Sequence, residues 1–291
     1  MSDFDTCLRP AFTEKLLKRL QKGESLNLLS DDPDDVQRLF SEIKSRSSGV
    51  CWLRVSLKAY ARSFDGFKQD LWRQLPQVQR GQTAPGQWKQ LVNLLEQQDK
   101  PVWLWLDALH SLFENSQIDK QYNQDFVNSL NSLRNNEHFA LLGVTEKPLN
   151  QSVFFVQGMD QPASVLELQP EKLPQLSAEL IQKEIKRHDV VRYEQTTILQ
   201  MVSDLQHRQY GFLAYVLSAV ENGEFNGMPI EQKLQRWQAE FYQGGVNLRQ
   251  SMKWRQWVFN WLKESLKWIN VLKMLSPVWQ FMRGIFSKKD K

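Results

Sequence analysis

The side chains that could do chemistry are mostly carboxylates placed directly after apolar runs. Four aspartates lie within residues 31–35, immediately after a four-residue apolar run. Asp107 follows a second run, residues 102–106, and Thr145 ends a third. Clustered carboxylates can bind a cation or dock a basic partner, but they can equally form the solvated start of a helix. A lone acid or hydroxyl at the end of a strand can also simply close a turn, so both interpretations stay open.

No established enzyme signature accompanies these residues. The sequence contains no G-x-S-x-G, H-E-x-x-H or C-x-x-C motif. Cys7 and Cys51 are too few for a disulfide framework or a four-thiolate zinc site, and Cys51 is expected to be inert core. His110 and His207 stand alone on ordinary segments, where packing or surface roles are the usual ones. The sequence therefore predicts no catalytic residue and no metal site.

The composition is that of a globular protein. The chain has 291 residues, of which 41% are hydrophobic and 24% charged, which excludes wholesale disorder and collagen-like repetition. This length allows one large domain or two small ones. The acidic N-terminus lacks the apolar stretch of a signal peptide. Charge-free windows such as residues 209–220 are too short for a membrane span of about 20 residues, so a cytoplasmic, reduced protein is expected.

The elements that must position these residues alternate between short apolar runs and helical patterns. Runs that are apolar on both faces predict buried parallel strands covered by helices. Strands are predicted at Leu26–Leu29 and at residues 50–57, 102–106, 139–144 and 165–168. Helices are predicted at residues 10–22, 34–45, 64–75, 87–98 and 125–135, with a loop at 76–86. Residues 177–187, 193–205 and 212–221 then predict helices without intervening strands, followed by a loop at 223–229.

The order of the motifs resembles that of P-loop NTPases of the AAA+ and STAND type. Arg9-Pro10 leads into the first predicted strand, and residues 102–106 are followed by Asp107-Ala108-Leu109-His110. The next strand ends in Thr145, and residues 207–212 form a turn before an apolar helix. The resemblance covers roughly residues 8–222. It implies a parallel sheet of about five strands flanked by helices, then a small helical lid-like subdomain.

The resemblance also implies where a nucleotide would bind. Ser30, Asp35, Asp107 and Thr145 match the positions of its nucleotide-binding residues. The family's phosphate loop, G-x-x-x-x-G-K-[ST], is nevertheless replaced by Ser30-Asp-Asp-Pro-Asp-Asp. A carboxylate about 4 Å from a phosphate would cost about 4 kcal/mol at an effective dielectric of about 20. The aspartates are expected to cap the following helix instead. Ala108 stands where the family has its catalytic Glu.

The C-terminal segment, residues 251–291, differs from the body in charge and composition. It holds nine Lys or Arg against Glu264 and Asp290, a net +7, whereas residues 1–250 carry −3. Apolar residues at helical spacing predict an amphipathic helix over residues 253–273. Such a helix can lie on an anionic membrane, pack against protein, or bind nucleic acid. The candidate membrane- or partner-binding residues are Trp254, Trp257, Trp261, Lys263, Lys267, Trp268 and Trp279.

The sequence thus predicts three parts: an α/β domain (1–170), a helical lid-like subdomain (171–250) and a basic tail (251–291). The predicted function is that of a non-catalytic regulatory or scaffolding protein, tethered by its tail to a protein partner or to the inner face of the membrane. Two alternatives remain: an atypical ATP-binding ATPase working with a partner subunit, and a nucleic-acid-binding AAA+-like subunit. No cofactor is predicted, except ATP and Mg²⁺ under the first alternative.

Overall fold

The computed structural model describes residues 6–76, 83–148, 166, 168–188, 192–222 and 229–243. The chain divides into two compact units, Met1–Asn226 and Gly227–Lys291. The predicted tail helix, residues 253–273, and the tail residues named above lie outside the described residues.

A single parallel sheet forms the centre of the first unit. Its order is β2-β3-β4-β1-β5, and its strands are β1 (Leu26–Leu29), β2 (Cys51–Ser56), β3 (Val102–Asp107), β4 (Phe139–Thr145) and β5 (Gln169–Lys172). Of the three interior strands, β3 and β4 have long continuous apolar runs, and β1 has three leucines beside the buried Asn27. Burial on both faces explains that pattern. The α/β class and the parallel five-stranded sheet predicted from the sequence are confirmed.

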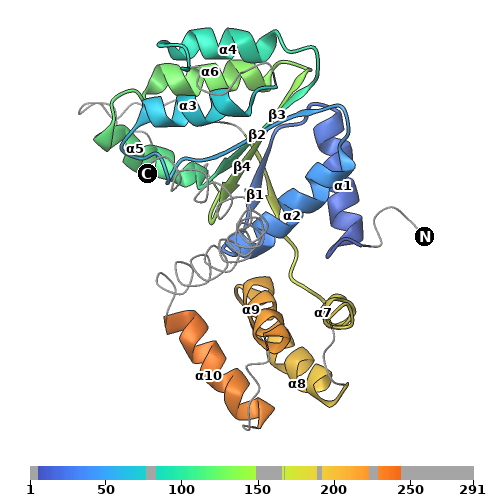
Figure 1. Ribbon diagram of the computed structural model, residues 1–291. Coiled ribbons are helices and arrows are strands. Elements are labelled where there is room, and N and C mark those ends of the chain that lie inside the picture. Colours follow the sequence, from blue (N-terminus) through green and yellow to red (C-terminus); the bar gives the residue numbers. More distant parts are fainter. Residues whose placement is uncertain are drawn as a thin grey trace, which may run out of the picture. The chain divides into compact units, whose positions relative to one another are not determined.

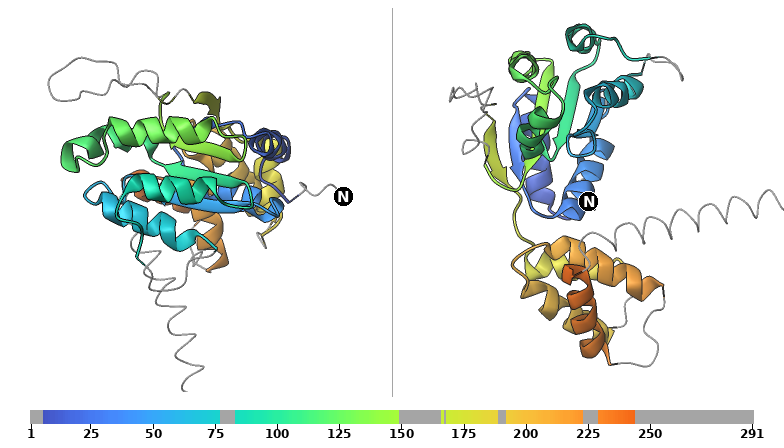
Figure 2. Two further views of the ribbon diagram at one scale, coloured as in Figure 1. Left: turned by 90° about the horizontal axis from the view of Figure 1, so that it is seen from above. Right: turned by 90° about the vertical axis from the view of Figure 1, so that its left-hand side faces the viewer.

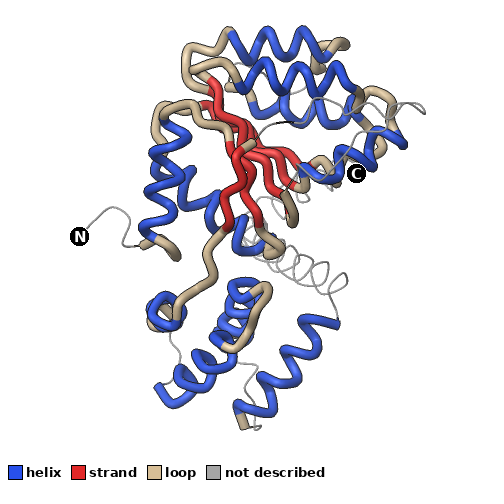
Figure 3. The backbone as a smooth tube through the Cα atoms, turned by 180° about the vertical axis from the view of Figure 1, so that it is seen from behind, coloured by secondary structure: helices blue, strands red, loops and turns tan. Residues whose placement is uncertain are grey.

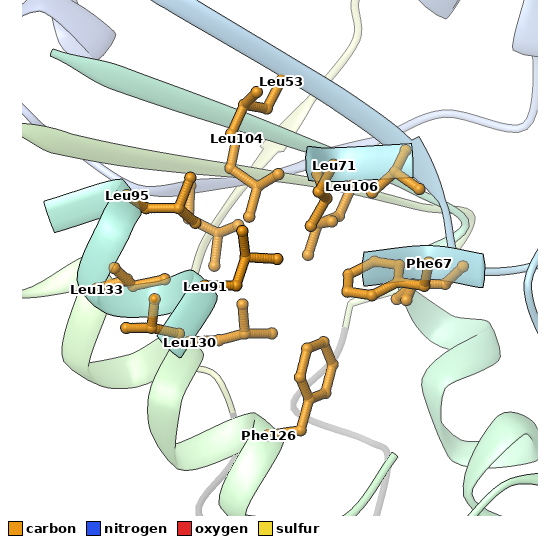
Figure 4. Close-up of a cluster of buried hydrophobic side chains, with 14 of the residues drawn as sticks. Leu53, Phe67, Leu71, Leu91, Leu95, Leu104, Leu106, Phe126, Leu130 and Leu133 are labelled. Atoms are coloured by element: carbon orange, nitrogen blue, oxygen red, sulfur yellow. The ribbon is translucent and has the colours of Figure 1, made fainter. Parts of the chain in front are cut away.

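Helices cover both faces of this sheet (Figure 1 and Figure 2). On one face, α1 (Pro10–Gln21) and α2 (Pro33–Arg46) pack on a core that includes Leu16, Ile43 and Trp105. The other face carries α3 (Phe64–Gln74), α4 (Trp88–Glu96) and α6 (Gln124–Arg134). Figure 4 shows the leucines and phenylalanines of this second core pointing toward one another. The helices on the two faces hold in place the strands whose carboxyl ends carry the candidate residues.

Local sequence signals explain where the helices begin. Asp32, Ser63, Asn123 and Ser177 each cap a helix by accepting backbone N–H groups of its first turn. Pro33 takes the first helical position of α2, where its missing N–H costs nothing. The start of α2 is therefore encoded by the same residues that replace the expected phosphate loop.

Two short helices follow β3, and a helical segment ends the first unit. The short helices are η1 (Leu109–Ser111) and α5 (Leu112–Ile118), and the segment contains α7 (Ala178–Ile185), α8 (Arg192–Ser203) and α9 (Gln209–Glu221). In the second unit, the described helix is α10 (Ile230–Gln243). The red strands and blue helices of Figure 3 trace this order along the chain. Within the described residues, the structure has no helix that is long and apolar enough to span a bilayer.

One predicted strand is misplaced. The sequence predicts it at residues 165–168, of which 165 and 167 lie outside the description, but Leu166 and Leu168 are buried without forming a strand. The fifth strand is β5, which begins at Gln169, directly after the predicted range. Its side chains are mostly exposed. It lies at the edge of the sheet beside β1, and it contains Pro170. Edge strands tolerate proline and polar residues, so they lack the apolar signal used to predict the others.

Candidate functional site

The candidate residues gather at the carboxyl end of the sheet. Leu29 lies opposite Thr145, and Ser30 N–H donates to the Thr145 carbonyl at 3.0 Å. After β1 the chain crosses to β2 at one edge of the sheet, and after β4 it crosses to β5 at the opposite edge. The direction in which the chain moves through the sheet therefore differs between these two neighbouring strands. Ligands of open α/β sheets bind outside the strand ends at such a reversal. The loop from Ser30 to Asp35 begins there.

Asp32 is the centre of this loop. Its Oδ1 atom accepts the backbone N–H groups of Asp34 (3.1 Å) and Asp35 (3.3 Å) in the first turn of α2. Its Oδ2 atom accepts the N–H group of Gly211, in the first turn of α9, at 2.7 Å. The residue is 4% exposed. A carboxylate of the chain itself therefore occupies the anion-binding position at the N-terminus of α2.

Burial also perturbs the protonation of this carboxylate. It raises the pKa of Asp32, although the N–H groups of Gly211, Asp35 and Asp34 act in the opposite direction. These donors favour the charged form, whereas loss of water disfavours it. The expectation of a solvated helix start is wrong for Asp32 and Asp35, which are both buried. It describes Asp31, which is exposed.

Asp35 forms a buried ion pair with Arg9. The guanidinium donates from Nη1 to Oδ1 (2.6 Å) and from Nη2 to Oδ2 (2.7 Å), and its Nε donates to the Pro174 carbonyl at 2.6 Å. Both side chains are 7% exposed. Burial raises the pKa of Asp35 to about 6, against the lowering effect of Arg9. The basic partner of this aspartate is therefore inside the same chain.

A second acid, Glu42, continues the charged contacts along α2. It accepts the backbone N–H of Leu8 (2.8 Å), the Thr13 hydroxyl (3.2 Å) and Arg38 Nε (2.7 Å). Arg38 also lies 3.5 Å from Glu184 of α7, which is 4% exposed. Charged side chains thus connect α1, α2 and α7. Buried charges persist only where they are paired and hydrogen-bonded in this way.

Asp107 is engaged by its neighbours in the sheet. Arg54 of β2 donates from Nε to Oδ2 at 2.7 Å, and Trp105 Nε1 donates to Oδ1 at 2.9 Å. The Arg54 guanidinium lies 4.4 Å from the centre of the Phe40 ring, and its Nη1 donates to Gln37 at 2.7 Å. Both carboxylate oxygens therefore already accept protein donors.

Ala108, directly after Asp107, has a left-handed backbone with φ 53° and ψ 45°. This conformation is uncommon for a residue other than glycine. The turn directs Leu109 back over β4, where its Cδ2 atom would lie 2.3 Å from a Cβ atom added to Gly143. Ala108 thus forms a tight corner between the strand and η1.

Ser30 and Thr145 make local contacts. The Ser30 hydroxyl accepts the N–H of Asp32 at 3.1 Å, which closes a tight turn. The Thr145 hydroxyl donates to the Lys147 carbonyl at 2.6 Å and is 3.0 Å from Asn27 Oδ1. Thr145 is 1% exposed. Both hydroxyls stabilise turns at the ends of neighbouring strands.

The helical segment contributes a further set of contacts to this end of the sheet. His207 Nδ1 lies 3.0 Å from Asp31 Oδ2, and Gln209 Oε1 accepts the N–H of Leu176 at 2.9 Å. Burial raises the pKa of Tyr210 to about 12. Within the described residues, no group of three His, Cys, Asp or Glu side chains could hold a metal ion.

The structure brings together all four predicted nucleotide-position residues at one end of the sheet. Sequence reasoning missed Arg9, Arg54 and Gly211 as partners of the site, and it did not single out Asp32 within its cluster. The local signal for Asp32 was present, because an aspartate directly before a proline is typical of a helix N-cap. The other three lie far from their partners in the sequence, and pairings of that kind leave no local pattern.

No family model and no curated protein matches the chain. Several solved structures resemble the chain at low sequence identity. Drosophila ORC bound to DNA is 14% identical over 74% of the chain, with a TM-score of 0.43. The ORC2 protein of Aeropyrum pernix is 16% identical over 79%, with a TM-score of 0.49. Domain III of DnaA from Thermotoga maritima is 10% identical over 79% of the chain and 90% of that domain, with a TM-score of 0.49.

The likeness to these proteins is one of fold alone. The chain spans 56% of the Drosophila chain and 66% of the Aeropyrum chain. The chain itself forms a parallel five-stranded sheet flanked by helices.

Proposed function

We propose that the chain is a non-hydrolysing AAA+-like protein with a regulatory or scaffolding role. The observation that carries the proposal is the position of the Asp32 carboxylate, which accepts three backbone N–H groups where a phosphate would bind. A bound triphosphate would have to displace this buried anion. Each like-charge contact at about 4 Å would otherwise cost about 4 kcal/mol at an effective dielectric of about 20.

The cationic groups of the site support the same proposal. A P-loop lysine neutralises the phosphates directly. Here Arg9 is bound at both Nη atoms by Asp35, and Arg54 is bound by Asp107. Neither guanidinium can turn to a nucleotide without leaving a partly or fully buried carboxylate unpaired. Losing one partner of a buried pair costs about 3–5 kcal/mol.

Neither Asp107 nor Ala108 supplies the remaining parts of an ATPase mechanism. Asp107 already accepts two donors, so binding a cation would mean giving up one of these bonds. Ala108 has no group that could polarise a water molecule. We therefore propose that the helix-covered sheet presents surfaces to a protein partner and that the chain does not turn over nucleotide.

The test is nucleotide binding by the purified full-length chain. Differential scanning fluorimetry with 5 mM ATP and Mg²⁺ should leave Tm unchanged relative to Mg²⁺ and NaCl at the same ionic strength. A Kd above about 5 mM would add less than about 0.4 kcal/mol of stability, whereas a Kd of about 5 μM would add about 4 kcal/mol. Isothermal titration that finds micromolar affinity for ATP or ADP would overturn the proposal.

We also propose that the tail tethers the chain to an anionic membrane surface. The support comes from the sequence: a net +7 with five tryptophans in residues 251–291. Each Lys or Arg near an anionic bilayer contributes roughly 1 kcal/mol, and tryptophan favours the interface. The full-length chain should sediment with anionic vesicles and less with neutral ones. Binding should be lost in Trp257→Glu with Trp261→Glu, and kept in the control pair Trp257→Phe with Trp261→Phe.

The vesicle experiment also separates this tether from a protein contact. Chain that stays in the supernatant with both kinds of vesicle contradicts the membrane tether. Salt should weaken binding to anionic vesicles without abolishing it, because burial of the tryptophans does not depend on charge.

A further inference from the structure

One buried carboxylate joins the N-termini of two helices that are far apart in the sequence. Asp32 Oδ1 serves the first turn of α2, and Asp32 Oδ2 serves the first turn of α9. The two oxygens therefore have separate partners. This division makes it possible to change one contact and keep the other.

The helix α9 lacks a cap of its own. Its N-cap residue is Arg208, which has a left-handed backbone (φ 52°) and makes no capping hydrogen bond from its side chain. The first N–H groups of a helix have no partner within the helix, so each needs an external acceptor when buried. Gly211 is buried, and Asp32 supplies the acceptor at 2.7 Å. The positive ends of both helix dipoles also favour a negative charge there.

We propose that Asp32 is a latch that docks the helical segment α7–α9 on α2 by capping α9 from a distance. The proposed function concerns nucleotide turnover, whereas this proposal concerns how the segment is held on α2 and needs no ligand. Other contacts also join the segment to α2, among them Arg38 with Glu184. Arg38 is 32% exposed and its distance to Glu184 is 3.5 Å, so this contact is weaker than the buried one of Asp32.

The test is the substitution Asp32→Asn in the full-length chain. Asparagine is as good an N-cap as aspartate, so its oxygen can still accept the N–H groups of Asp34 and Asp35. Its amide NH₂ group would then face the N–H of Gly211, donor against donor. Hydrogen exchange measured by mass spectrometry should become about tenfold faster or more in peptides covering α9, since a hydrogen bond to a charged group is lost. Peptides covering α2, β1 and β4 should keep their protection.

The matched control is Asp125→Asn, which removes an exposed carboxylate from the first turn of another helix, α6. It should leave the exchange of α9 unchanged. If Asp32→Asn does not fold, Asp32→Ser replaces it, because serine also caps α2 and offers no acceptor that reaches Gly211.

Two results would overturn the latch. One is unchanged exchange of α9 in the Asp32 variant. The other is an equal rise in exchange over α9 and the strands β1 and β4, because Asp32 would then stabilise the whole unit and not the docking of the segment. Neither result depends on whether ATP binds, so failure of the latch is distinct from failure of the proposed function.

Discussion

Arg54 in β2 holds the carboxylate of Asp107, at the end of the neighbouring strand, through a hydrogen bond of 2.7 Å from Nε to Oδ2. The guanidinium is fixed from its other side by the Phe40 ring and by Gln37. An acid that the family resemblance places at a nucleotide-binding position is thus part of an ion pair between strands. This pair can be tested by its effect on stability.

Asp107→Asn should lower the free energy of unfolding by about 1–3 kcal/mol, because the charge-assisted bond to Arg54 is lost. The bond from Trp105 can remain, since asparagine Oδ1 is also an acceptor. Urea denaturation followed by tryptophan fluorescence measures the change. The exposed Asp125→Asn is the control and should change stability by less than about 0.5 kcal/mol. An equally small effect of Asp107→Asn would show that the ion pair contributes nothing net.

Asp35 should give the stability a pH dependence. Burial raises its pKa to about 6, so the folded state binds the proton more tightly than the unfolded state does. Its contribution is full below about pH 4 and is lost as the pH rises through 6, a change of about 3 kcal/mol. The wild-type free energy of unfolding should therefore fall relative to that of Asp35→Asn between pH 4 and pH 7.

Only the slope of that difference matters, because loss of the contact with Arg9 adds an offset that does not depend on pH. The exposed Asp125→Asn should follow the wild type across the same range. A difference that is flat, or that rises with pH, would contradict the raised pKa of Asp35.

Gly143→Ala should destabilise the sheet by about 1–3 kcal/mol, because the added methyl group overlaps Leu109. Leu109→Ala alone should cost about 2–5 kcal/mol, since Leu109 is 1% exposed. The double variant should lose less than the sum, because each small residue makes room for the other change. Strict additivity in urea denaturation would show that the two residues are not in contact.

Ala108→Glu should fold and should not hydrolyse ATP. The residue already has a Cβ atom at a positive φ, so glutamate adds little backbone strain. The side chain could polarise a water molecule, but the segment of residues 30–35 would still bring a carboxylate to the phosphate position. A phosphate-release assay at 5 mM ATP and Mg²⁺ should give the same background rate for the variant and the wild type. Turnover by Ala108→Glu would show that the phosphates do bind.

The interior of the sheet could be predicted because burial acts on local sequence. The strands β3 and β4 are apolar on both faces, and this leaves a continuous run for each, whereas β1 is recognised by three buried or half-buried leucines around Asn27. In contrast, β5 joins the sheet through backbone pairing with β1 at the edge. Its side chains are mostly exposed, so its sequence lacks the apolar pattern that predicts a strand. The helix α10 was missed although its apolar residues recur at helical spacing, so closer attention to periodicity could have found it.

The site was predictable only where its contacts are local. The capping of α2 by an aspartate follows from the residues around Pro33. The partners of Asp32, Asp35 and Asp107 come from other elements, and the sequence shows their charges without showing which pairs form. A cluster of acids next to a helix start therefore looked solvated, whereas the fold buries two of them against donors from distant segments.

The bond between Asp32 and Gly211 spans 179 residues, which has a consequence for synthesis. A ribosome adds about 5–20 residues per second, so β4 is available for pairing with β1 several seconds before α9 emerges. During that interval the carboxylate of Asp32 can remain in water, and the sheet can assemble without the cost of its dehydration. The nascent chain thus passes through a stage at which α2 is already capped while its second acceptor oxygen is still open to other donors.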